Sequence, residues 1–132
     1  MKKLFLDFCN KNGLRVEDLG DGWLGAYIPN HYFTENQERD EVTFMEYSDS
    51  GLSYICFETC VTCYYDALNS GVTIEFDSCK SINIYKEKDF KLVEETYKNI
   101  IAKLEFFNVL IKEMKINERK KSLEKDFQKE TN

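Results

Sequence analysis

Apolar residues recur at alternating steps of four and three along the C-terminal third of the chain, from Val93 to Met114. This spacing puts about one apolar side chain per turn on one face of an α-helix, so it predicts a helix that begins after Asp89, a good N-cap. The stripe consists of Val93, Tyr97, Ile100, Leu104, Phe107, Ile111 and Met114. Ile101, Phe106 and Leu110 widen it, which favours packing across a sheet, with a coiled-coil dimer seam as the alternative.

The preceding residues predict one shorter helix and a sheet. Apolar residues from Leu4 to Cys9 share a helical face, and Asn12-Gly13 is a stop signal, so we expect a helix over residues 2–12. From Gly22 onward, turn signals separate short runs rich in β-branched and aromatic residues: WLGAYI, VTFMEY, LSYICFETCVTCYY, VTIEF and INIY. The predicted fold class is therefore α+β: an N-terminal helix, an antiparallel meander of about five strands, and a long C-terminal helix packed on the sheet.

The 132 residues fit a single domain, which we assign to residues 1–116, followed by a charged helical or frayed extension over residues 117–132. The turn sequence YSDSGL predicts a hairpin that pairs Phe44 with Ile55 and Val42 with Phe57. The sequence LNSGV either closes another hairpin or ends a short helix that begins near Thr59. Residues 28–41 are polar and predict a long loop.

Three of the five cysteines lie in the stretch CFETCVTC, residues 56–63. The Cys-x3-Cys-x2-Cys spacing resembles that of radical-SAM enzymes, which implies an iron–sulfur cluster in a β/α barrel, but the antiparallel pattern and the short chain favour another fold. A zinc site would need Cys79 or His31 as a fourth ligand. On a strand with a break near residues 58–60, Cys63 faces away from Cys56 and Cys60. We therefore expect buried free thiols, with no metal and no cofactor, and a thiol-based metal or redox protein is the remaining alternative.

Charge is distributed unevenly along the chain. Between Val16 and Cys79 there are thirteen acidic residues against one basic residue, Arg39, a net charge of −12, whereas the whole chain carries −6. No lysine occurs in that stretch. The sequence also lacks a phosphate-cradling glycine loop, a nucleophile elbow and a pair of histidines at metal-ligand spacing, so we expect no enzymatic activity.

An acidic surface interleaved with aromatic side chains predicts binding to a basic surface of another protein, such as the cleft of a nucleic-acid enzyme. In size and charge the chain is similar to small counter-defence inhibitors of phages and plasmids, the anti-CRISPR and anti-restriction proteins. This similarity implies that the chain mimics nucleic acid and inhibits a host protein. The candidate partner-binding residues are Glu35, Glu38, Asp40, Glu41, Glu46, Tyr47, Asp49, Tyr54 and Glu58.

The order of helices and strands is also similar to that of acidic secretion chaperones, so a chaperone or immunity protein that holds one cognate protein is the alternative. We expect a cytoplasmic protein because the apolar N-terminal run is too short for a secretory signal and no later run approaches a membrane span. No direct nucleic-acid or membrane binding is expected, and the chain is either a monomer or a homodimer formed through the C-terminal helix.

Overall fold

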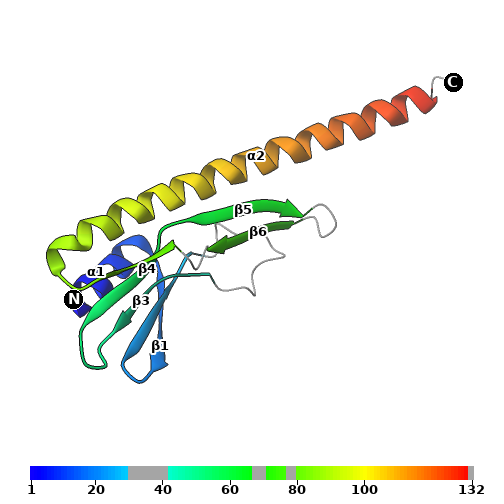
Figure 1. Ribbon diagram of the computed structural model, residues 1–132. Coiled ribbons are helices and arrows are strands. Elements are labelled where there is room, and N and C mark those ends of the chain that lie inside the picture. Colours follow the sequence, from blue (N-terminus) through cyan, green and yellow to red (C-terminus); the bar gives the residue numbers. More distant parts are fainter. Residues whose placement is uncertain (30–41, 67–70, 77–79, 131–132) are drawn as a thin grey trace.

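Figure 1 shows the computed structural model, which describes residues 1–29, 42–66, 71–76 and 80–130. The first element is helix α1 (Lys2–Asn12), which confirms the predicted N-terminal helix. It ends because Gly13 adopts the left-handed conformation (φ 70°) and donates its N–H to the Cys9 carbonyl, a conformation that glycine tolerates best. The face formed by Phe5, Phe8 and Cys9 is buried.

The described strands form two antiparallel sheets. The larger has the order β1-β2-β3-β4-β7, and the smaller pairs β5 with β6. The strands are β1 (Arg15–Gly20), β2 (Trp23–Tyr27), β3 (Thr43–Ser48), β4 (Tyr54–Glu58), β5 (Val61–Asp66), β6 (Gly71–Phe76) and β7 (Ser81–Ile84). The sequence did not predict β1, because this edge strand is almost wholly exposed and lacks the apolar alternation of a half-buried strand.

The cysteine-rich stretch forms two strands rather than one. β4 ends at Glu58 and β5 begins at Val61, so the predicted break near residues 58–60 is confirmed. β5 then pairs with β6, with Asp66 opposite Gly71, which decides for a hairpin and against the short helix. The Lys103 ammonium of the C-terminal helix donates to the Val61 carbonyl and ties the start of this hairpin to that helix.

The predicted register of the β3–β4 hairpin is wrong. Ile55 pairs with Tyr47 rather than Phe44, and Phe57 pairs with Met45 rather than Val42. The connection is longer than the predicted tight turn, because Ser48 pairs with Tyr54 and residues 49–53 join the two strands. β3 is also irregular against β2, where Ala26 pairs with Met45 but Tyr27 pairs with Thr43, so that Phe44 is an extra residue. Phe44 and Met45 are consecutive and both are buried, which strict strand alternation does not allow.

Helix α2 (Phe90–Glu130) follows a 3₁₀ turn at Glu87–Asp89 and has 41 residues. Figure 1 shows it crossing above the strands and projecting well beyond them. The predicted stripe is buried from Val93 to Ile111 except for Phe107, which is partly buried, so these turns pack on the core rather than forming a dimer seam. The predicted widening is wrong for Phe106 and Leu110, which are exposed. Met114, the last member of the stripe, is 44% exposed, and residues 112–127 are all exposed.

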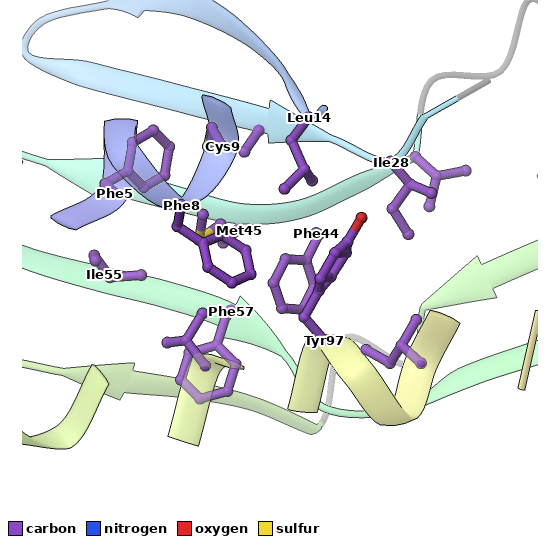
Figure 2. Close-up of a cluster of buried hydrophobic side chains, with 14 of the residues drawn as sticks. Phe5, Phe8, Cys9, Leu14, Ile28, Phe44, Met45, Ile55, Phe57 and Tyr97 are labelled. Carbon is purple, nitrogen blue, oxygen red and sulfur yellow. The ribbon is translucent and has the colours of Figure 1, made fainter. Parts of the chain in front are cut away.

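Both helices cover the same face of the larger sheet, and Phe8 lies where they meet (Figure 2). Its ring centroid lies 5.2 Å from that of Tyr97 and 5.6 Å from that of Phe90, both edge-to-face. Tyr97 in turn lies 5.0 Å from Phe44 of β3. This aromatic cluster joins α1, α2 and the sheet, so neither helix covers the opposite face of the sheet.

Candidate protein-binding face of the sheet

The face of the larger sheet turned away from the helices is polar and aromatic. In β4 the side chains alternate: Ile55 and Phe57 are buried in the core, whereas Tyr54, Cys56 and Glu58 are half-buried and lie on the other face. We call that face, with the residues that share it on the neighbouring strands, the outer face. It includes Arg15, Glu17, Leu19, Trp23, Tyr27, Glu46, Tyr54, Cys56, Glu58 and Tyr85.

A row of acidic residues crosses the outer face. Glu17 of β1 pairs with Gly25, which pairs with Glu46 of β3. Glu46 in turn lies opposite Cys56, two residues before Glu58. Glu17 and Glu46 are two strand spacings apart, about 10 Å, because Gly25 lies between them, and Glu58 lies diagonally from Glu46 at about 7–8 Å. The row therefore places carboxylates from separate parts of the sequence along one face. The Ser81 hydroxyl donates to Glu58 Oε2 at 3.0 Å and helps to fix that carboxylate.

The pKa of the Cys56 thiol reports this concentration of negative charge. It is raised, first by burial and then by the charges of Glu58 and Glu46, and the hydrogen bond from Ser81 offsets part of the effect. Because a raised pKa keeps the thiol protonated, Cys56 is a poor nucleophile at neutral pH.

Three aromatic rings stack in a second row, beside the acidic one. The Trp23 and Tyr54 rings meet edge-to-face at 5.8 Å, and Tyr54 lies 5.4 Å from Tyr85 just after β7. Tyr85 is 51% exposed. Aromatic rings held in place by their neighbours contribute contact area at low entropy cost and are enriched among the residues that anchor protein interfaces.

Gly25 lets two side chains lie close over the middle of the sheet. A Cβ atom at this position would lie 3.2 Å from Leu19 Cδ1 and 3.6 Å from the Tyr27 hydroxyl. The Arg15 guanidinium stacks over the Tyr27 ring at 4.5 Å and lies 3.4 Å from Glu17 Oε2. This cation therefore pairs with the member of the acidic row that lies on the edge strand.

The structure brings together only part of the predicted binding set. Glu46, Tyr54 and Glu58 share the outer face, and Asp49 lies at its end, where its backbone N–H donates to the Gly22 carbonyl at 2.9 Å. Tyr47 is 3% exposed, stacks on Phe5 in the core and hydrogen-bonds Ser53, so its ring offers almost no surface to a partner. The remaining predicted residues, Glu35, Glu38, Asp40 and Glu41, lie outside the described residues.

Several residues of the outer face were not in the predicted set, among them Glu17, Trp23, Cys56 and Tyr85. Trp23 could have been found, because the alternation in WLGAYI places it on one face with Gly25 and Tyr27. Glu17 could not, since it belongs to a strand without an apolar pattern. Tyr85 follows β7 and reaches the face only through its contact with Tyr54.

The thiols are distributed rather than clustered. Cys56 lies on the outer face, Cys60 is exposed between β4 and β5, and Cys63 packs against the core. The predicted burial of the thiols is therefore wrong for Cys60 and only partial for Cys56 and Cys63. Burial raises the pKa of Cys63 and raises that of Cys9 to about 12. Within the described parts of the chain, no three His, Cys, Asp or Glu side chains converge on a point that could hold a metal ion.

A groove of about 690 Å³ lies between α1 and α2. Its apolar lining consists of Leu4, Phe8, Phe90, Tyr97 and Ile101, and its rim carries charges of both signs, from Asp7, Lys11, Glu94, Lys98 and Glu105. The mixed rim distinguishes this groove from the acidic outer face, so the two surfaces suit different ligands.

Comparison with known protein families, with curated proteins and with solved structures finds no match to this chain. None of the helices in the described ranges combines the length and the apolar character needed to cross a membrane.

Proposed function

We propose that this chain is a non-catalytic inhibitor that binds a basic surface of a host protein through the outer face. The observation that carries the proposal is the joining of an acidic row, Glu17, Glu46 and Glu58, to a row of stacked aromatic rings on the same face. Carboxylates steer an approaching basic partner and the rings supply buried contact area, and these are separate requirements of a tight complex.

The proposed partner surface is a cleft that normally binds nucleic acid. Such clefts are rich in lysine and arginine because each nucleotide contributes a negative phosphate. The stretch from Val16 to Cys79, which supplies most of the outer face, carries a net charge of −12 without a single lysine. A protein of this kind acts in the cytoplasm as a nucleic-acid mimic, in the manner of counter-defence inhibitors that evade antiviral systems.

The decisive experiment compares two variants with equal charge changes. The test variant carries Glu17→Lys, Glu46→Lys and Glu58→Lys on the outer face, and the control carries Glu95→Lys, Glu118→Lys and Glu124→Lys on the exposed side of α2. Each protein is immobilised and exposed to host extract at about 0.05 M and about 0.5 M salt, with circular dichroism as the check of folding.

We expect the unaltered chain and the control to retain the same basic protein at low salt, and the test variant to lose it. Excess duplex DNA should release that protein if its nucleic-acid cleft is the occupied surface. Equal loss of binding by both variants would mean that overall charge, and not the outer face, determines binding. Undiminished binding by the test variant would show that the outer face is not the binding surface.

The groove between α1 and α2 favours a second candidate, a chaperone or immunity protein that holds one cognate protein. An apolar floor with a mixed-charge rim is the kind of groove that receives an amphipathic helix. A partner retained at high salt, and lost on Ile101→Asp rather than on the outer-face changes, would identify this function instead.

A further inference from the structure

Helix α2 changes character where it leaves the sheet. The buried stripe ends at Ile111, and the same four-three spacing continued past Met114 reaches Glu118, Lys121 and Lys125, which are charged and exposed. Figure 1 shows this part of the helix projecting past the strands. The apolar surface that packs on the sheet therefore ends at that point.

Apolar residues continue on the opposite face of the helix. At 100° per residue, the positions at alternating spacings of three and four from Phe106 to Phe127 lie roughly opposite the buried stripe. We call them the seam: Phe106, Val109, Glu113, Ile116, Lys120, Leu123 and Phe127. Its five apolar members are between 52% and 69% exposed. Large apolar side chains repeated along one face of a projecting helix mark an interaction surface.

The seam is self-complementary when its direction is reversed. One set of positions reads Phe106, Glu113, Lys120, Phe127, with an aromatic ring at each end and opposite charges between them. The other set reads Val109, Ile116, Leu123, with Ile116 at its centre. A two-fold axis near Ile116 therefore brings aromatic ends together and sets Glu113 of one copy beside Lys120 of the other, as an isologous contact requires.

We propose that the seam binds a second copy of this chain, with the two α2 helices antiparallel. In a parallel pair Glu113 would face Glu113 and Lys120 would face Lys120, and buried like charges disfavour that arrangement. The antiparallel pair replaces both repulsions with attractions. This interface uses neither the outer face nor the groove, so it is independent of the proposed inhibitory function.

Two rim positions oppose the contact weakly. Lys112 and Arg119 flank the seam and come near each other across the axis, where exposed like charges cost little and salt screens them. Association is therefore measured at about 0.15 M salt, which screens the rim more than the buried pair.

The first test is the mass of the full chain in solution by light scattering across a concentration series. We expect a species of twice the 15.6 kDa chain mass at high concentration. Leu123→Asp should abolish it, whereas Ser122→Asp, one residue away on the sheet-facing side, should leave it intact with the same circular dichroism. A monomer at every concentration, or a dimer indifferent to Leu123→Asp, overturns the proposal.

The second test fixes the orientation. Glu113→Lys and Lys120→Glu should each weaken the dimer by about tenfold or more, because each single change creates two like-charged pairs across the axis. The doubly exchanged variant should recover the original affinity. A parallel dimer predicts almost no change in any of the three variants, and that result would refute the antiparallel arrangement.

Discussion

Glu46 of β3 lies directly opposite Cys56 of β4, on the face of the sheet that the helices leave uncovered. Together with Glu58, this carboxylate raises the pKa of the thiol beyond what burial alone produces. The reactivity of the Cys56 thiol therefore depends in part on the negative charge that Glu46 and Glu58 place on the outer face. Chemical reactivity at this thiol can be used to measure that charge.

Replacing Glu46 with glutamine should lower the pKa of Cys56, because it removes one of the negative charges that raise it. The thiolate fraction at fixed pH then rises, and Cys56 should react faster with iodoacetamide at about pH 8. Mass spectrometry of the labelled peptide gives the rate. Glu95→Gln on α2 is the control and should change nothing. An unchanged labelling rate of Cys56 in Glu46→Gln would show that the charge of Glu46 does not affect the thiol.

Stability should fall at high pH through Cys9, whose pKa burial raises to about 12. Its thiol ionises in the unfolded chain at lower pH than in the folded one, so the unfolded state is favoured progressively above the ordinary cysteine range. The loss from one such group is at most about 1.4 kcal/mol per pH unit. The free energy of unfolding of Cys9→Ala should depend less steeply on pH between about 9 and 11. Parallel curves for the two proteins would contradict this.

Phe8→Ala should destabilise the fold by about 3–5 kcal/mol, since Phe8 packs against Phe44, Phe90 and Tyr97 at the junction of α1, α2 and the sheet. Leu6→Ala on the same helix is the matched control, because Leu6 is exposed, and it should cost about 1 kcal/mol or less. Urea unfolding measures both. Similar losses would mean that α1 does not dock through Phe8.

Gly13→Ala should cost about 1 kcal/mol, and Gly13→Asn less, because the residue has a φ of 70° and asparagine tolerates that conformation better than alanine. A Cβ atom here would meet no neighbour within 4 Å, so the loss comes from the backbone alone. Thermal unfolding of the three proteins tests the order. Alanine at least as stable as asparagine would refute the left-handed cap.

Ending the chain after residue 116 should leave the folded domain almost unchanged in stability, because residues 112–127 are all exposed and bury nothing against the sheet. The melting temperature at low concentration should shift by no more than about 2–4 °C. The same truncation removes Lys120, Leu123 and Phe127 and should abolish self-association. A large loss of stability in the monomer would show that the projecting part of α2 supports the domain.

Local patterns in the sequence determined most of the element list. The Val93–Ile111 stripe and the Asn12-Gly13 stop each define one helix through side chains a few residues apart, and these predictions are confirmed. The turn-bounded apolar runs each form one strand, except the cysteine-rich run, which forms two. β1 escaped prediction because an exposed edge strand takes its structure from its partner β2 rather than from its own residues.

The register of β3 and the composition of the outer face were decided only by the tertiary structure. Residues 49–53 connect β3 to β4, which is a longer loop than the tight turn that YSDSGL predicts, and this loop sets the register of the two strands. The extra residue at Phe44 belongs to the pairing of β3 with β2, and no local signal marks it. The sequence therefore determined that the middle of the chain is acidic and aromatic. The fold decided that Glu17, Glu46 and Glu58 share a face with Trp23, Tyr54 and Tyr85 while Tyr47 is buried, since strand pairing joins residues that are distant along the chain.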